Sequence, residues 1–422
     1  MAKKTFSILT LGCRTNQYES GAYHQQLLQM GYAPVQAGFS PDLCIINTCT
    51  VTHSADQRSR AKIVQAMKKY PGTRIVVTGC FVDSAKGVEE ELIALGQVHG
   101  CPVQIVPNQK KEALVEALFP DERAYPEFKI EQVEARTRAF VKIQDGCNSF
   151  CTYCIIPYVR GRSRSRKTDD ILREIRTLAE NGYKEVVLTG INIGDFSDEG
   201  TTLADLVWKV DAIEGIERIR ISSIDPDEID DALKEAVLYA KKTCPSMHIV
   251  LQSGSNAILK RMNRKYTRQI FLDAVDTLRQ ERPSFAVTTD VIVGFPGEEE
   301  ADFLATIDMM EQVGFARVHM FPYSPRKRTR AALYNNRVPP EEIQKRKMQL
   351  LRQAEQVAFR VRAPYVGQKI PVLLEHKEGS RFFGHTPEFL PVFVRGEGLQ
   401  TNQIVSVDIL QNHPEGLEGI CR

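Results

Sequence analysis

Short apolar runs alternate with longer amphipathic stretches through the first 118 residues of the chain. The apolar runs are rich in Val, Ile and Leu, which is typical of buried parallel strands. They occupy residues 6–11, 43–47, 74–78 and 102–106. The stretches between and after them have the repeat of amphipathic helices and cover residues 16–30, 54–70, 84–95 and 110–118. This alternation predicts an open, parallel α/β sheet.

A second series of strand–helix units begins at residue 139. Its strand candidates are residues 139–143, 185–188, 218–221, 248–251, 286–293 and 317–321. Each candidate ends in polar or glycine-rich residues. Six such units predict a partial (β/α)6 barrel, an incomplete relative of the eightfold barrel, with its active site at the carboxyl ends of the strands.

The pattern changes again after a predicted helix at 341–361. Apolar and polar residues then alternate in runs separated by turn residues, at 369–375, 381–386, 390–394 and 404–410. This predicts a small antiparallel β-barrel. The domains expected are therefore an α/β domain at 1–118, a charged linker with two prolines at 119–138, a barrel core at 139–362 and the small barrel at 363–422.

Composition adds two constraints. The chain has 422 residues, 42% of them hydrophobic and 26% charged, and a net charge of +2, so total charge does not indicate a partner. Its ten cysteines, without secretory context, favour a reducing compartment in which thiols serve metals or catalysis. No apolar run approaches the length of a membrane span, so we expect a cytoplasmic protein that does not bind membranes.

Three cysteines follow the first strand of the second series at the spacing Cys-x3-Cys-x2-Cys. They are Cys147, Cys151 and Cys154. Three thiolates can hold three irons of a [4Fe-4S] cluster and leave the fourth iron open to S-adenosylmethionine (SAM). A structural zinc site is the alternative, but tetrahedral zinc normally has four local ligands.

A second trio becomes visible only when the strands are drawn. Cys13, Cys49 and Cys80 each follow a predicted strand of the N-terminal sheet. Carboxyl ends of parallel strands share one edge, so three distant thiols are expected to converge on a second cluster. The alternative is that they are small buried hydrophobes, the interpretation that we prefer for Cys44, Cys101, Cys244 and Cys421.

Polar strand ends supply candidates for SAM binding. They are Thr189, Gly190, Asn192, Ser222 and Gln252, whose groups could reach the ribose and amino acid parts of SAM. Ordinary turn chemistry is the alternative for each. No catalytic residue is assigned beyond the cysteines.

Two basic segments are candidates for nucleic-acid binding. The first holds Arg160, Arg162, Arg164 and Arg166. The second lies within residues 317–352, which contain ten Arg or Lys and only two acidic residues, Glu341 and Glu342. It includes Arg326, Lys327 and Arg328. Such patches in a near-neutral protein indicate contacts with RNA phosphates. A solvated loop is the alternative for the first segment, and residues 363–422 are slightly acidic.

With both cysteine trios in view, the chain resembles the radical-SAM methylthiotransferases along essentially its full length. That family joins an N-terminal domain with three cysteines, a radical-SAM partial barrel and a C-terminal TRAM barrel. Within the family, the run from residue 141 to 166 is most similar to the bacterial MtaB branch. One departure is Arg328, which stands where relatives usually carry glycine.

The resemblance implies two [4Fe-4S] clusters, an auxiliary one on the trio of Cys13 and a SAM-binding one on the trio of Cys147. One SAM would methylate a sulfur held at the auxiliary cluster, and a second would be cleaved to a radical. The substrate implied is tRNA with N6-threonylcarbamoyladenosine beside the anticodon, which gains a 2-methylthio group. We expect a monomer that takes electrons from a donor such as a flavodoxin-type reductant.

Other functions stay open at this point. Sister enzymes act on isopentenylated adenosine in tRNA or on an aspartate of a ribosomal protein. A non-catalytic iron–sulfur or RNA-binding protein belongs to a different class, but that interpretation leaves the open-corner cluster motif unexplained.

Overall fold

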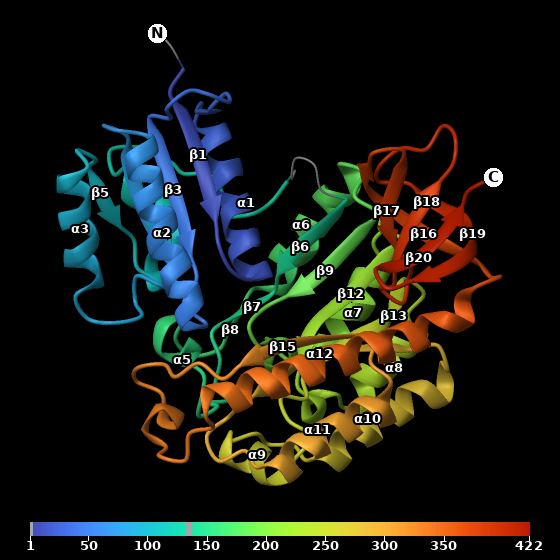
Figure 1. The fold of residues 1–422 in the computed structure, drawn as a ribbon. Coiled ribbons are helices and arrows are strands. Elements are labelled where there is room, and N and C mark those ends of the chain that lie inside the picture. Colours follow the sequence, from blue (N-terminus) through green and yellow to red (C-terminus); the bar gives the residue numbers. More distant parts are fainter. Residues whose placement is uncertain (1–2, 132–136) are drawn as a thin grey trace. The chain divides into compact units, whose positions relative to one another are not determined.

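The computed structural model describes residues 3–131 and 137–422, and these form two compact units (Figure 1). The first unit consists of Met1–Val133, Asp145–Arg164 and Ser324–Leu333. The second consists of Glu134–Gln144, Ser165–Tyr323 and Tyr334–Arg422. The division into four domains remains a prediction, and residues 132–136 of the predicted linker lie outside the described residues.

A five-stranded parallel sheet forms the centre of the first unit. Its strand order is β2-β1-β3-β4-β5. The strands are β1 (Thr5–Thr10), β2 (Ala33–Pro34), β3 (Leu43–Thr48), β4 (Arg74–Gly79) and β5 (Val103–Ile105). The predicted open α/β sheet is confirmed. The short edge strand β2 was not predicted, because it has no apolar run in the sequence.

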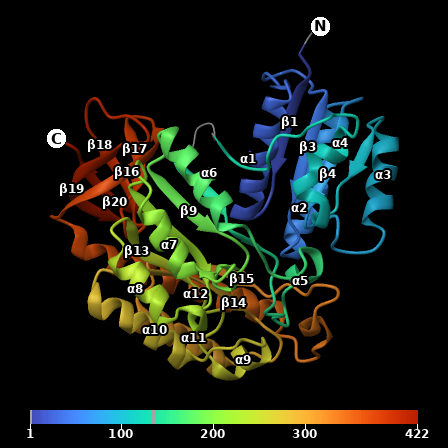
Figure 2. The same cartoon turned by 180° about the vertical axis from the view of Figure 1, so that it is seen from behind.

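Helices cover both faces of this sheet (Figures 1 and 2). The helices are α1 (Arg14–Gln29), α2 (His53–Lys69), α3 (Val88–Val98), η1 (Asn108–Ala113) and α4 (Leu114–Leu118). Apolar residues of α2 and α3 pack on one face, and those of α1 and α4 pack on the other. Helix α3 begins later than predicted because Gly87, in the left-handed region at φ +84°, precedes its first turn.

The other two segments of the first unit are short. Asp145–Arg164 contains the cysteine loop and helix α5 (Ile156–Val159), and Ser324–Leu333 contains η4 (Arg330–Leu333). Hydrogen bonds attach the second segment to α2, since the His53 amide donates to Ser324 Oγ at 2.9 Å. Three stretches far apart in the sequence therefore build one unit.

The second unit contains a six-stranded parallel sheet with the strands in chain order, β6-β9-β12-β13-β14-β15. They are β6 (Arg138–Lys142), β9 (Glu185–Thr189), β12 (Arg218–Ile224), β13 (Thr243–Ile249), β14 (Ala286–Val293) and β15 (Arg317–Pro322). Strand β13 begins earlier than predicted. Pro245 interrupts its apolar pattern at the place where the register with β12 shifts, which is where a strand tolerates proline.

Helices connect these strands. They are α6 (Thr168–Glu180), α7 (Leu203–Asp211), α8 (Asp231–Tyr239), α9 (Asn256–Arg261), α10 (Arg268–Glu281), α11 (Glu300–Val313) and α12 (Pro340–Arg362). Shorter pieces are β7 (Gln144–Asp145), β8 (Arg164–Ser165), β10 (Ser197–Asp198), β11 (Thr201–Thr202), η2 (Ile193–Asp195), η3 (Pro226–Glu228) and η5 (Ala363–Tyr365). Among the described residues, no helix is both long and apolar enough to cross a bilayer.

The C-terminal residues close into a five-stranded barrel in the order β16-β17-β18-β20-β19. The strands are β16 (Lys369–Glu378), β17 (Arg381–His385), β18 (Pro391–Arg395), β19 (Ile404–His413) and β20 (Gly416–Ile420). The fifth strand was not predicted, because Gly416, Glu418 and Gly419 obscure its pattern. It pairs parallel to β18, so the barrel is antiparallel except at this ladder.

Candidate cysteine clusters and cofactor site

Three cysteines lie at the carboxyl ends of neighbouring strands in the first unit. Cys13 follows β1 and precedes α1, Cys49 follows β3, and Cys80 follows β4. The loops touch one another: a Cβ placed on Gly12 would lie 2.8 Å from Cys49 Cβ, and the Cys80 amide donates to Thr48 O at 3.1 Å. The predicted convergence of the three loops on one sheet edge is therefore seen.

Asn16, in the first turn of α1, holds two of these loops in place. Its Nδ2 donates to Leu11 O at 2.9 Å and to Thr48 O at 2.8 Å. Its Oδ1 lies 3.4 Å from Cys13 Sγ. One buried amide therefore connects the chain before Cys13 with the chain before Cys49, which orders both cysteines relative to each other.

Burial shifts the pKa of two thiols of this trio. Burial raises the pKa of Cys49 to about 11. Burial also raises the pKa of Cys80, although the Arg160 charge opposes the shift. Both groups are therefore neutral thiols at pH 7 without metal, and binding iron would release their protons.

The second trio lies on the loop between β7 and α5. Cys151 is buried, and Cys147 and Cys154 are partly exposed. The loop folds back on itself, because the Cys147 amide donates to Gly161 O at 3.1 Å. Gly146 permits this approach: it has φ +73°, and a Cβ there would lie 2.0 Å from Arg162 O. A compact, partly open loop of three thiols suits a cluster with one exchangeable position.

No group of three or more His, Cys, Asp or Glu side chains in residues 3–131 and 137–422 is arranged to hold a metal ion. Both trios consequently remain predicted ligand sets. Among the other four cysteines, Cys44, Cys101 and Cys244 are buried, as expected of small hydrophobes, and Cys421 is half-buried.

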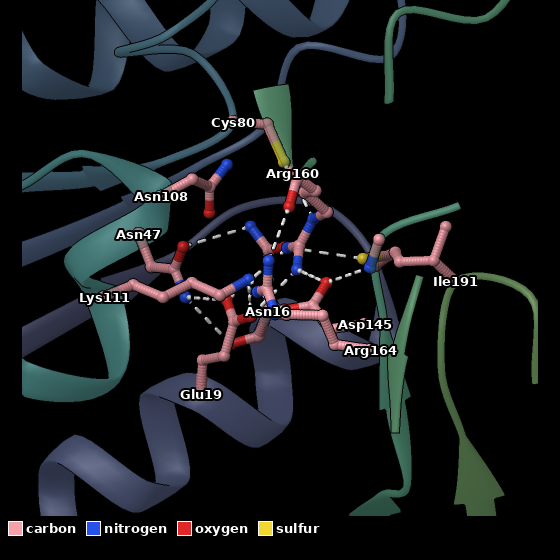
Figure 3. A network of polar contacts seen from close by, with 12 residues as sticks. Asn16, Glu19, Asn47, Cys80, Asn108, Lys111, Asp145, Arg160, Arg164 and Ile191 are labelled. Atoms are coloured by element: carbon pink, nitrogen blue, oxygen red, sulfur yellow. Dashed lines mark hydrogen bonds and ion pairs between the residues drawn. The ribbon is translucent and has the colours of Figure 1, made fainter. Parts of the chain in front are cut away.

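A buried arginine joins the two cysteine-bearing regions inside the first unit (Figure 3). Arg160, six residues beyond Cys154, has only 1% of its surface exposed. Its Nε donates to Cys80 Sγ at 3.1 Å. Its terminal nitrogens donate to Asn16 Oδ1 at 2.6 Å and to Glu19 Oε1 at 2.9 Å. The segment with one trio thus contributes a charged hydrogen-bond donor to a sulfur of the other.

Two buried carboxylates and a lysine complete this network. Arg160 also pairs with Asp145 at 2.9 Å. Lys111 Nζ lies 2.7 Å from Glu19 Oε1 and 2.5 Å from Asp145 Oδ2. Two cations and two anions balance, which is the condition under which buried charges are tolerated. This network had no recognisable signal in the sequence beyond polar residues within otherwise apolar stretches.

The predicted phosphate-binding residues separate into three classes by exposure. Arg162, Arg164, Lys327 and Arg328 are exposed in the first unit. Arg166 is partly buried and pairs with Glu174 at 2.7 Å in the second unit. Arg160 and Arg326 are buried, and Arg326 pairs with Asp56 at 2.6 Å. The structure argues against the prediction for these last two, because a buried, ion-paired guanidinium is out of reach of a phosphate.

The five candidate SAM contacts all lie in the second unit, at the carboxyl ends of its strands. Thr189 ends β9, Ser222 lies near the end of β12, and Gln252 follows β13. Ser222 Oγ and Gln252 Oε1 are buried without a hydrogen-bond partner among the described residues. Gln252 also has φ +62°, a strained conformation for a non-glycine residue. Buried unsatisfied atoms at strand ends indicate a ligand that supplies their partners.

Gly190 and Asn192 belong to a tight turn after β9. The Asn192 amide donates to Gln144 Oε1 at 3.0 Å. A Cβ on Gly190 would lie 2.8 Å from the same oxygen, so the turn requires glycine for close approach rather than for a positive φ. The Asn192 side chain donates to Glu228 Oε1 at 2.7 Å.

Glu228 is a candidate that sequence reasoning missed. Burial raises its pKa to about 7, with Asp225 adding to the shift and the hydrogen bond from Asn192 opposing it. Its Oε2 is buried and has no hydrogen-bond partner in the described part of the chain. A carboxylate with a raised pKa beside unsatisfied polar atoms is typical of a ligand site. The only available signal was its place two residues after Pro226, just beyond a strand end.

Comparisons with known proteins agree with this geometry. Residues 141–310 match the family model described as "Radical SAM superfamily", and residues 5–112 match "Uncharacterized protein family UPF0004". The chain is 48% identical over 419 residues to "Threonylcarbamoyladenosine tRNA methylthiotransferase MtaB" of Chlamydia pneumoniae, covering 99% of this chain and 98% of the relative. It is 36% identical to the protein of the same name from Bacillus subtilis, covering 96% and 94%.

A relative with a different printed substrate also matches. It is the "tRNA-2-methylthio-N(6)-dimethylallyladenosine synthase" of Syntrophomonas wolfei, 38% identical over 88% of this chain and 86% of the relative. Among solved structures, the radical S-adenosylmethionine methyltransferase TsrM from Kitasatospora setae aligns with a TM-score of 0.55 at 14% identity, over 77% of each chain. That likeness concerns the fold alone.

Proposed function

The chain belongs to the radical-SAM tRNA methylthiotransferases, and we propose that it places a methylthio group at C2 of N6-threonylcarbamoyladenosine next to the anticodon of tRNA. The observation that carries this proposal is the presence of two cysteine trios in one compact unit. Near-complete alignment with a relative named for this reaction supports the choice of substrate.

The residues that would hold two [4Fe-4S] clusters are the two trios. Cys13, Cys49 and Cys80 would hold the auxiliary cluster, and Cys147, Cys151 and Cys154 the SAM-binding cluster. A cluster held by either trio would have three protein ligands for its four irons, which fits clusters that bind an exchangeable group. When bound, such clusters supply the electron for reductive cleavage of SAM and a place to hold the transferred sulfur.

The surrounding side chains would orient and shield the auxiliary trio. Arg160 donates to Cys80 Sγ, and Asn16 fixes the loops before Cys13 and Cys49. Because Cys80 and Arg160 are both buried, water is kept from this sulfur. A charged donor on a ligand sulfur favours the more negative, reduced state of a cluster.

The second unit would bind SAM through its strand-end residues. Ser222, Gln252 and Glu228 present buried atoms with no hydrogen-bond partner among the described residues, and a ribose diol and an ammonium group supply hydrogen-bond donors. Thr189, Gly190 and Asn192 shape the turn beside them. A cationic ligand at Glu228 would stabilise its ionised form and so lower its pKa from about 7.

The proposed partners follow from the reaction: tRNA and an electron donor such as a flavodoxin-type reductant. We propose that the enzyme is a monomer and that it acts in the cytoplasm, where tRNA is modified. A further substrate, dimethylallyladenosine, is favoured by the relative from Syntrophomonas wolfei, so the experiment must separate the two nucleosides.

Mass spectrometry of tRNA nucleosides tests the proposal. A strain that lacks this gene should lose the 2-methylthio form of threonylcarbamoyladenosine and keep that of dimethylallyladenosine. Wild-type protein should restore the nucleoside, and Cys49→Ala or Cys151→Ala should not. In vitro, Cys151→Ala should also lose SAM cleavage, whereas Cys49→Ala should keep it. Loss of the dimethylallyl product instead would refute the substrate, and product from Cys49→Ala would refute the role of the auxiliary trio.

A further inference from the structure

Two arginines and two aromatic rings form a row of ring contacts on the first unit. The Arg162 guanidinium lies 4.3 Å from the centre of the Phe150 ring. Phe150 meets Tyr158 edge to face, with ring centres 6.2 Å apart. The Arg328 guanidinium lies 5.1 Å from the Tyr158 ring centre. We call these four residues the arginine–aromatic row.

The row is accessible, and it joins two distant stretches of the chain. Tyr158 is 41% exposed, and Arg162 and Arg328 are exposed as well. Arg328 comes from the segment 324–333, whereas the other three come from the cysteine segment 145–164. Its guanidinium also donates to Tyr158 O at 3.5 Å and to Asp83 O at 3.3 Å. The row therefore depends on tertiary structure and is not a local loop contact.

Two members of the row have strained backbones. Phe150 has φ +47° and Arg328 has φ +76°, both in the left-handed region that favours glycine. Such conformations cost free energy and persist mostly at functional sites. At Arg328 glycine would adopt the same backbone freely. What the arginine adds is its guanidinium, which lies over the Tyr158 ring and donates to Tyr158 O and Asp83 O.

The two segments that carry the row have exposed charges of one sign, and the half-buried carboxylate of Asp83, from another segment, lies near Arg328. Arg164, Lys327 and Arg330 are exposed in the same two segments, and neither segment holds an exposed acidic side chain. Their one acidic residue, Asp145, is buried in the network with Arg160 and Lys111. A polyanion would be attracted by the exposed cations of these two segments.

We propose that the arginine–aromatic row is a stacking platform for unpaired nucleotides of a tRNA loop. Single-stranded RNA is recognised by bases that stack on aromatic rings and on arginine planes, while nearby cations meet its phosphates. The row supplies both kinds of surface within the unit that carries the cysteines. This inference rests on the proposed function, because it takes tRNA as the substrate.

An acidic electron-donor protein is the competing partner for this surface. Its carboxylates would need only positive charge, which Arg164, Lys327 and Arg330 already supply. Aromatic rings with arginines over them and a strained Arg328 would add little to such a contact. The row therefore favours RNA, and protein docking becomes an outcome of the test.

Binding of a hairpin RNA with the sequence of an anticodon stem-loop tests the platform, measured by fluorescence anisotropy with anaerobically reconstituted full-length protein. A blunt duplex of the same stem is the comparison ligand. Wild-type protein should prefer the hairpin, and Tyr158→Leu should weaken hairpin binding by about fivefold or more with little effect on the duplex.

Arg328 gives the sharpest variants. Arg328→Gly relieves the backbone, so its thermal midpoint should stay level or rise while hairpin binding falls. Arg328→Lys keeps the positive charge and the backbone strain but loses the planar guanidinium group, and it should also bind the hairpin less tightly. Arg330→Ala removes a nearby exposed cation and should lower binding to hairpin and duplex alike.

Three results would overturn the platform. The first is equal affinity of wild-type protein for hairpin and duplex. The second is wild-type hairpin binding by both Tyr158→Leu and Arg328→Gly. The third is unchanged RNA binding in these variants with slower reduction by flavodoxin, which would assign the row to a protein partner. If nucleoside analysis refutes the tRNA product while hairpin binding still depends on the row, the proposed function fails and the platform stands.

Discussion

At the scale of single residues, Arg160 shows how one side chain connects parts that are distant in sequence. It reaches α1 through Asn16 and Glu19, and it reaches the end of β4 through Cys80. Its own chain segment carries the second cysteine trio. Removing one member of such a buried network leaves charges without partners, which costs far more than a surface ion pair contributes.

We therefore expect Arg160→Met to destabilise the protein by about 3–5 kcal/mol, because Glu19 and Asp145 would be left with Lys111 as their remaining buried cation. Urea unfolding followed by fluorescence measures the change. Arg330→Met, an exposed arginine of the same unit, serves as the control and should change stability by less than about 0.5 kcal/mol. Similar values for the two variants would show that the network contributes no more than a surface charge.

At the scale of elements, the C-terminal barrel is attached to the parallel sheet of the second unit by arginines of β12. Arg218 donates to His385 O at 3.0 Å. Arg220 donates to Thr386 O and to Pro387 O, both at 2.8 Å, and pairs with Glu185 at 2.7 Å. These bonds reach backbone carbonyls at the end of β17 and just beyond it. The small barrel is thus fixed to the sheet through its own loop rather than joined by a flexible linker.

The element-scale prediction concerns this attachment. Arg220→Met should leave Glu185 buried with weaker partners and loosen the barrel, at a cost of about 3 kcal/mol. Limited proteolysis should then release a C-terminal fragment faster than in the wild-type protein. Arg395→Met is the matched control, since Arg395 is exposed and pairs with Glu418 at the barrel surface. Equal cleavage of both variants would argue against attachment by β12.

At the scale of the whole molecule, chain order and compact units do not coincide. The loop with Cys147, Cys151 and Cys154 follows β6 and β7 in sequence, but it packs with the N-terminal sheet. All six predicted cluster ligands consequently belong to the first unit, whereas the candidate SAM contacts belong to the second. The buried network of Arg160 is the physical reason that the loop stays with the first unit.

Iron content is the property of the whole molecule that this arrangement predicts. Anaerobically reconstituted protein should hold about eight irons per chain, and replacing either trio by alanine should leave about four. Iron and zinc analysis of the three proteins measures this. About four irons in the wild-type protein, or zinc in either trio, would remove the basis of the two-cluster proposal.

Much of this architecture is determined by local sequence. The apolar runs predicted nearly all the long strands correctly, and the strand ends predicted that Cys13, Cys49 and Cys80 lie on one edge of the sheet. Both predictions were possible because hydrophobic periodicity and strand direction depend on the nearby chain. The edge strand β2 and the last barrel strand β20 were not predicted, because the first is short and the second is rich in glycine. The cluster spacing of the second trio was also visible from sequence alone.

Burial is what only the tertiary structure decided. Arg160 and Arg162 are two residues apart in the same basic run. Arg160 is buried against Cys80, whereas Arg162 is exposed and lies over the Phe150 ring. Burial raises the pKa of Glu228, and a hydrogen bond from Asn192, in the turn after β9, opposes the shift. Side-chain environment depends on which distant segments pack around a position, and a residue's sequence neighbours do not contain that information.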